Sequence, residues 1–250
     1  MLFEDRPIES VPDLLAALED LAVGDNRHWF RGHGDTSWRL LPKLSRIGKP
    51  EAEPLLIKRF KQDAPLLVDR IPSDDDDWEW LFLMQHHGVP TRLLDWTENP
   101  LVGLYFAVNA ESHAHTDGCL WCLDPMGLNE AARYQPTFGA DIPLIGSDEH
   151  LKLYSPQSVR GQSDTEVMPI AALGMRGFSR ISAQAGVFTI GHYRPVPIED
   201  VDGGAHVGRL VVPAQAKPAI LKQLEVLGFS EKTLFPDLTS LAKHVAGLLE

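Results

Sequence analysis

The fold is decided by one stretch near the middle of the chain, Gln85-His86-His87-Gly88-Val89-Pro90-Thr91-Arg92-Leu93-Leu94-Asp95-Trp96-Thr97. The apolar spacing of residues 78–87 predicts a helix that ends there, because Gly88 is a favoured residue just past a helix terminus. Residues 89–95 are expected to be extended. Residues 101–109 predict a second, apolar helix, with Thr97 as its cap and Pro100 in its first turn. The pattern indicates a strand between two helices.

Outward from this stretch, the apolar spacing predicts the remaining elements. Helices are expected over residues 10–22, 51–68, 217–227 and 236–250, and strands at 28–32, 119–123, 186–190 and 208–212. The apolar side chains on the second and fourth of these helices that are expected to face inward are Leu55, Leu56, Phe60, Leu67, Leu238, Leu241, Val245 and Leu248. Residues 124–179 show little periodicity, which predicts a loop-rich insertion over the site.

Helices dominate the first half of the chain, and strands are spread through its middle and end. This distribution predicts the α+β class, with a single domain built on a mixed, mostly antiparallel sheet flanked by helices. A chain of 250 residues can bury one sizeable core. We expect an N-terminal helix and lead-in over 1–28, the main domain over 29–245, and a helix over 236–250 that closes the domain.

Composition and charge restrict the classes of function. The 35 acidic and 23 basic residues give a net charge of −12, which argues against broad binding to a nucleic-acid backbone. The first quarter is nevertheless locally basic, through Arg39, Lys43, Arg46, Lys49, Lys58, Arg59 and Lys61. No run approaches the ~20 apolar residues of a membrane span, and the N-terminus lacks the apolar core of a secretory signal. We therefore expect a cytoplasmic location and no membrane partner.

No metal site is expected. Cys119 and Cys122 form a CxxC pair on a predicted strand, where residues i and i+3 face opposite sides of a sheet. No second pair is present to complete a zinc site, so both are expected to be unpaired core cysteines. The four aspartates at 74–77 lack the spacing of a calcium loop.

The segment Phe30-Arg31-Gly32 ends a predicted strand on an arginine. The planar guanidinium suits a phosphate or a carboxylate, and a glycine lets a ligand approach the backbone. The equal alternative is that Arg31 pairs with a core carboxylate such as Asp95. Because Asp95 lies between Leu94 and Trp96, we expect it to be buried and paired with Arg31 or Arg92.

Polar side chains in two further places complete the candidate set. His86 and His87 lie about 100° apart on a helix and do not suit one metal ion. Arg180 and Gln184 enter an apolar strand, where they hold either a ligand or a turn through hydrogen bonds to the backbone. Acid–base candidates are His33, His86, His87, Asp95 and Glu98, and the sequence does not choose among them. We predict that one pocket is lined by Arg31, one of His86 and His87, Arg92 and Gln184.

Taken together, these segments resemble the FRG domain, a bacterial family named for its Phe-Arg-Gly start. The start corresponds to Phe30-Arg31-Gly32, and the central stretch continues as Asn99-Pro100-Leu101 and Leu104-Tyr105-Phe106-Ala107. Later matches are Arg180, Gln184, Gly186 and Phe188, followed by Thr233-Leu234-Phe235-Pro236-Asp237-Leu238. The resemblance extends from about Trp29 to about Val245, so the main domain over 29–245 is expected to be an FRG domain.

A looser resemblance is to the ADP-ribosyltransferase fold, which implies an ADP-ribosyltransferase-like core and NAD as substrate. That fold places Arg-Gly on a first strand, a second strand before a helix, and Gln-x-Glu on a third. Here Arg31-Gly32, residues 91–107 and Gln184-Ala185-Gly186 follow the same order. Gly186 stands where the fold often has a catalytic glutamate, so either another acid serves or that chemistry is absent.

The resemblance implies a role for each matching residue. Arg31 would hold the pyrophosphate or ribose, Arg92 would add a phosphate contact, and the histidines would position the nicotinamide ribose with Thr97. The implied catalytic residues are Arg31, His86, His87, Asp95 and Thr97. The implied NAD-binding residues are Arg31, Gly32, Thr91, Arg92, Tyr105, Arg180 and Gln184.

The expected function is therefore modification of a protein or nucleic-acid acceptor with NAD, or NAD hydrolysis, in a toxin or phage-defence effector. An antitoxin or another component of a defence system is the expected partner. Two alternatives stay open. One is a nucleic-acid-binding or RNA-processing module without NAD, with stacking from Trp29, Trp38, Trp78 and Trp96. The other is a non-enzymatic interaction domain.

Overall fold

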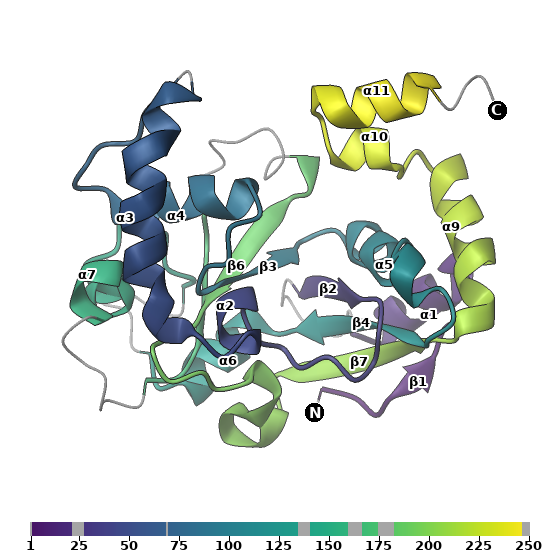
Figure 1. Cartoon of the computed structure of the whole chain (residues 1–250). Coiled ribbons are helices and arrows are strands. Elements are labelled where there is room, and N and C mark those ends of the chain that lie inside the picture. Colours follow the sequence, from purple (N-terminus) through teal and green to yellow (C-terminus); the bar gives the residue numbers. More distant parts are fainter. Residues whose placement is uncertain are drawn as a thin grey trace.

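The computed structural model describes residues 2–21, 28–68, 70–134, 141–159, 167–174 and 183–246. These residues confirm the α+β class, with a seven-stranded mixed sheet flanked by helices (Figure 1). The strands are β1 (Arg6–Pro7), β2 (Trp29–His33), β3 (Leu93–Thr97), β4 (Gly118–Leu123), β5 (Ile170–Ala172), β6 (Gly186–Ile190) and β7 (Val207–Val212). Their order is β1-β7-β4-β2-β3-β6-β5. Only the β1–β7 pair is parallel among these strands.

Helices cover both sides of this sheet. They are α1 (Val11–Leu21), α2 (Lys43–Arg46), α3 (Glu53–Asp63), α4 (Asp77–His86), α5 (Pro100–Val108), α6 (Pro125–Ala131), α7 (Pro156–Val159), α9 (Lys217–Val226), α10 (Glu231–Leu234) and α11 (Leu238–Ala246). In Figure 1, α3, α4 and α7 lie to the left, and α1, α5 and α9 lie to the right. The short helices α10 and α11 stand above α5.

The core has a separate apolar cluster on each face of the central strands. On one face, α1, α5 and α9 pack on β2, β4 and β7, and Cys122 belongs to this cluster. On the other face, Cys119 packs with Trp29 and Trp121. A third cluster joins α3 and α4 to β3, β5 and β6. The two cysteines are buried, unpaired and on opposite faces, as the alternation of a strand predicts.

The boundaries around the central stretch differ from the expectation. The extended strand begins at Leu93 rather than at residue 89, since Gly88 adopts a positive φ of 78° and leads into a loop. Thr97 is the last residue of β3 and does not cap α5. The cap is Asn99, whose side chain accepts a hydrogen bond from the amide of Leu101. Asn99 caps because it lies directly before Pro100, the first residue of the helix.

Two short strands were not anticipated. β1 has two residues and β5 has three, which is too short for a clear alternation of apolar and polar side chains. β5 lies within residues 124–179 and pairs with β6 at one edge of the sheet. The described part of this segment also contains α6 and α7. The segment therefore adds an edge strand to the sheet and two of the helices that flank it.

Several apolar side chains expected to face inward are exposed. Leu238 is 84% exposed, and Leu241 and Val245 on α11 are also exposed, because α11 packs mainly against α10. Leu55 on α3 and Leu67 after it are exposed as well, and Leu248 lies outside the described residues. The predicted helix over 51–68 is broken into 3-10 turns at Pro50–Ala52 and Ala64–Leu66 on either side of α3. Among the described residues, no helix has the length and apolar character required to cross a bilayer.

Candidate functional site

The site lies where two neighbouring strands diverge. β2 pairs with β4 along its whole length, from Trp29 to His33, and β3 pairs with β6 along its whole length. Between β2 and β3, however, the one paired position is Phe30 opposite Thr97. Beyond that pair the two strand edges separate, and their backbone groups need other partners.

A pocket of about 310 Å³ opens at this divergence, a volume at the lower end of the range for small-molecule sites. Its walls come from β2, β3, β6, α4 and α5 and from the turn after β2. The lining residues are Phe30, Arg31, Gly32, Gly34, Trp38, Phe82, Gln85, His86, Asp95, Trp96, Thr97, Val102, Gly103, Phe106, Ala110, Gln184, Gly186 and Phe188. The walls are therefore largely apolar and aromatic, with a small polar set.

Arg31 crosses the gap between the strands. Its Nη1 donates a hydrogen bond to the backbone oxygen of Asp95 at 2.6 Å, and its Nε donates to Nε2 of His33 at 3.0 Å. Burial lowers the pKa of Arg31 to about 10, and the charge of Asp95 opposes this effect. The guanidinium stays protonated at neutral pH, so it places a positive charge at the pocket wall.

His33 is a neutral support for Arg31. Only 1% of the residue is exposed, and burial followed by the charges of Arg31 and Arg46 lowers its pKa to about 2. Because Nε2 accepts from Arg31, the ring proton of the neutral form must be on Nδ1. His33 is absent from the pocket wall. A histidine that stays neutral at physiological pH is a poor general acid, so the structure removes His33 from the acid candidates.

The expectation that Asp95 is buried and paired with an arginine is wrong. Asp95 is exposed in an otherwise buried strand, because it shares the face of Leu93 and Thr97 where β3 borders the pocket. Its carboxylate accepts a hydrogen bond from Nε2 of Gln85 at 2.8 Å, and Arg31 binds its backbone oxygen instead. Among the residues that the structure describes, Asp95 is the one carboxylate on the pocket wall.

A short chain of hydrogen bonds orients Asp95. The hydroxyl of Thr91 donates to Oε1 of Gln85 and accepts from the amide of Leu93 at 3.2 Å. This fixes the amide of Gln85 so that its nitrogen faces Asp95. Thr91 is fully buried and is not part of the pocket wall. It acts on Gln85 and has no direct access to a ligand in the pocket.

Arg92 does not line the pocket, contrary to our expectation. It is buried with Glu53 on α3, and its Nε donates to Oε2 of that carboxylate at 2.6 Å. Its backbone amide donates to Oε1 of Glu53 at 3.0 Å, and its Nη1 donates to the backbone oxygen of Tyr154 at 3.2 Å. Arg92 lies directly before β3 and its side chain bonds to Glu53 of α3, so it joins α3 to the start of the strand and is not available to a phosphate.

Tyr105 is also outside the pocket. It is buried in the core, and its hydroxyl accepts a hydrogen bond from Nδ2 of Asn109 at 2.7 Å. Burial, with the charges of Glu231 and Glu225, raises the pKa of Tyr105 to about 12. Its neighbour Phe106 lines the pocket instead, because adjacent helical residues point about 100° apart.

The remaining candidates divide into those the pocket brings together and those it does not. His86 lines the pocket, whereas His87 is exposed and does not. Thr97 and Gln184 both line it, and the hydroxyl of Thr97 donates to the backbone oxygen of Gln184 at 2.6 Å. Arg180 lies outside the described residues.

Gly32 has a structural role as well as a place on the pocket wall. A Cβ atom at Gly32 would lie 2.1 Å from the carbonyl oxygen of Gly103 and 2.4 Å from the amide nitrogen of Ala107. Helix α5 therefore packs directly on the backbone of β2. The expected role, room for a ligand, is not what makes glycine necessary here.

The sequence reasoning missed most of the apolar wall. Trp38, Phe82 and Phe188 line the pocket, although Trp38 had been considered for stacking on nucleic acid and Phe188 only as a family match. Trp38 also packs edge-on against His33, with the ring centroids 5.7 Å apart. Apolar periodicity does not distinguish a pocket wall from a core, so no sequence signal separates these residues from the core.

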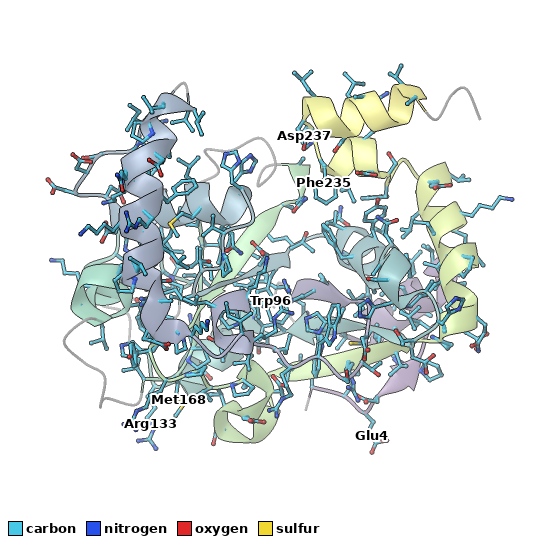
Figure 2. All side chains as sticks on the ribbon, viewed as in Figure 1. Glu4, Trp96, Arg133, Met168, Phe235 and Asp237 are labelled. Carbon is cyan, nitrogen blue, oxygen red and sulfur yellow. The ribbon has the colours of Figure 1, made fainter. Side chains whose placement is uncertain are left out.

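The C-terminal segment contacts the pocket wall from above. Nε2 of Gln184 donates to the backbone oxygen of Leu234 at 3.0 Å, and the ring of Phe235 packs edge-on against Phe106 at 5.9 Å between centroids. Figure 2 shows Phe235 and Asp237 where α10 meets α11, and Trp96 near the centre of the molecule. Residues about 50 positions apart in sequence thus share one wall.

The comparisons with known proteins support one family. No curated protein and no solved structure matches this chain. Residues 26–116, which include β2, α4, β3 and α5, match the model of the FRG domain. This match covers Arg31, His86 and Asp95 and supports the assignment of this part of the chain to the FRG family.

Proposed function

We propose that this protein is an ADP-ribosyltransferase-like enzyme that binds NAD in the pocket between β2 and β3. The observation that carries the proposal is the meeting of three distant segments at one pocket: Arg31, the stretch from Gln85 to Thr97, and Gln184. Polar groups that converge in an apolar pocket are typical of a small-molecule site.

The arrangement of the strands supports the same proposal. The three segments with the resemblance to ADP-ribosyltransferases lie on or next to β2, β3 and β6, and these strands are neighbours in the sheet. Helix α5 follows β3 and packs on β2 through Gly32. The three segments that follow one another along the chain in the resemblance therefore also lie on or next to neighbouring strands of the sheet.

The residues of the pocket suit transfer of a ribosyl group. In that reaction the bond from C1′ of the ribose to nicotinamide breaks, and nicotinamide leaves with the bonding electrons. An acceptor, or water, then bonds to C1′ and releases a proton. A carboxylate near C1′ stabilises the positive charge that develops on the ribose and takes the acceptor's proton. We assign this role to Asp95, which Gln85 orients. Asp95 would replace the usual catalytic glutamate, because Gly186 occupies the position of that glutamate here.

Arg31 and the aromatic residues would bind and orient the substrate. The protonated guanidinium of Arg31 would pair with the diphosphate. Trp38, Phe106 and Phe188 would pack against the nicotinamide ring and exclude water. The biological setting that we propose is a bacterial toxin or phage-defence effector that modifies a protein or nucleic acid and is controlled by an antitoxin-like partner.

The proposal is tested by calorimetry with NAD and by chromatography of released nicotinamide. We expect wild type to bind NAD and to release nicotinamide, and Asp95→Asn to bind NAD but to lose turnover. His86→Ala should weaken binding, and the matched change His87→Ala should have little effect because His87 is outside the pocket. A folded wild-type protein that neither binds NAD nor releases nicotinamide would refute the proposal.

The two alternatives predict different results. A nucleic-acid-binding module should bind single-stranded RNA in a salt-dependent manner and ignore NAD. Against it, Trp29 and Trp96, two of the tryptophans considered for stacking, are buried in the core. An interaction domain should bind neither ligand. Toxicity of the wild type on expression in bacteria, lost in Asp95→Asn, would support the effector setting.

A further inference from the structure

Some basic side chains of the first quarter form ion pairs with acidic residues, whereas Arg46 does not. Arg39 pairs with Glu199 and Asp200, and Lys61 pairs with Asp77. Arg46 is exposed and makes no side-chain hydrogen bond or ion pair with any described residue. Its charge is therefore available to a ligand.

The short helix α2, which carries Arg46, is bonded to the loop that precedes β3, and Arg46 itself is not part of the pocket wall. The amide of Leu44 donates to the backbone oxygen of Thr91 at 3.4 Å, and Nζ of Lys43 donates to the backbone oxygen of Gly88 at 3.3 Å. Both acceptors belong to the loop between α4 and β3, which connects the pocket residues His86 and Asp95. Figure 1 shows α2 at the centre of the molecule, in front of this region.

The charges of Arg46 and of the pocket act on one another. Partial desolvation lowers the pKa of Arg46, and the charge of Asp95 opposes that effect. Arg46 in turn lowers the pKa values of Arg31 and His33, after the larger effect of burial. The charges of Arg31 and Arg46 thus both act on the carboxylate of Asp95, although Arg31 bonds the backbone oxygen of that residue and Gln85 bonds the carboxylate. The pocket mouth has excess positive charge in a chain whose net charge is −12.

We propose that Arg46 and Arg31 together form a subsite for the diphosphate group of a dinucleotide at the mouth of the pocket. Two guanidinium groups near one carboxylate suit an anion with two adjacent phosphates. The identity of the whole substrate rests on the proposed function. The diphosphate subsite itself needs no turnover and is tested separately.

The experiment measures binding of ADP-ribose by calorimetry, with adenosine as the matched ligand without phosphates. Arg46→Ala should weaken ADP-ribose binding by about 10- to 100-fold, the loss expected for charge-assisted hydrogen bonds, and Arg46→Lys should recover part of it. Adenosine binding should not change. Lys49→Ala removes an exposed positive charge just after α2 and should leave ADP-ribose binding within about twofold of wild type. Thermal melts of each variant verify that it is folded.

The outcomes separate the subsite from the enzyme proposal. If ADP-ribose binds with the expected dependence on Arg46 and no nicotinamide is released from NAD, the subsite stands and the proposed reaction fails. If nicotinamide is released and Arg46→Ala leaves the KM for NAD unchanged, the reaction stands and the subsite is refuted. Equal losses in Arg46→Ala and Lys49→Ala would also refute it, because they would show a diffuse charge effect. The absence of ADP-ribose binding to the wild type would refute the subsite as well, whether or not single-stranded RNA binds.

Discussion

Replacing Arg92 with alanine is expected to destabilise the fold by about 3–5 kcal/mol, the loss typical of removing one partner from a buried ion pair. Glu53 has no exposed surface, and the guanidinium of Arg92 provides its charged partner. In Arg92→Ala the carboxylate keeps one hydrogen bond, from the backbone amide of residue 92. A loss of this size is a large part of the ~5–15 kcal/mol that stabilises a typical domain.

Urea unfolding followed by far-UV circular dichroism measures this loss directly. Arg70→Ala is the matched control, because Arg70 pairs with Glu79 at the surface and its side chain is 83% exposed. That change should cost at most about 1 kcal/mol. In the double variant Glu53→Gln with Arg92→Met, both charges are gone and the glutamine oxygen still accepts from the backbone amide. We expect this variant to recover more than half of the stability lost in Arg92→Ala.

The result that would refute this reasoning is specific. If Arg92→Ala unfolds within about 1 kcal/mol of wild type and the folded protein no longer binds NAD, then Arg92 contacts the ligand, as the sequence had suggested. If the double variant is no more stable than Arg92→Ala, an unpaired buried charge is not the cause of the loss.

Three further outcomes are expected. Gly32→Ala should lower the free energy of unfolding by at least about 1–3 kcal/mol, because the added Cβ meets rigid backbone of α5. Gly191→Ala is the control: a Cβ there would come no closer than 3.4 Å to its neighbours, so the same urea titration should show little change. Stability should fall as pH decreases below about 6.5, because the unfolded chain then binds a proton that His33, with its pKa of about 2, does not bind when folded. His33 contributes up to about 1.4 kcal/mol per pH unit to this slope, in addition to His28, His192 and His206, whose pKa values are also lowered by burial. His33→Gln should reduce the slope between pH 6.5 and 5, and an unchanged slope would mean that His33 is not buried in solution. Thr91→Val should lower nicotinamide release at least tenfold with less effect on NAD binding, because Gln85 loses the donor that orients it; unchanged turnover would remove this positioning role.

Local patterns in the sequence were sufficient for much of the fold. The apolar period of helix α4, the glycine after it and the proline at the start of α5 act over a few residues, and the structure has both helices close to the predicted positions. The strand at residues 186–190 appears as predicted. We predicted one pocket lined by Arg31, one of His86 and His87, Arg92 and Gln184. Arg92 does not line it, whereas Arg31, His86 and Gln184 do. Their polar side chains interrupt apolar segments, and such interruptions are visible in the sequence.

The tertiary structure alone decided the roles of Arg92 and Asp95. The partner of Arg92 is Glu53, which lies 39 positions earlier on a different element, and no local pattern links the two. Asp95 is flanked by apolar residues in a central strand, which in most sheets would bury it. Here β2 and β3 separate beyond Phe30 and Thr97, so that face of β3 opens to solvent and to the pocket. Where a strand loses its neighbour depends on the packing of α5 against Gly32 and on the pairing of distant strands, and these long-range contacts leave no periodic signal in the chain.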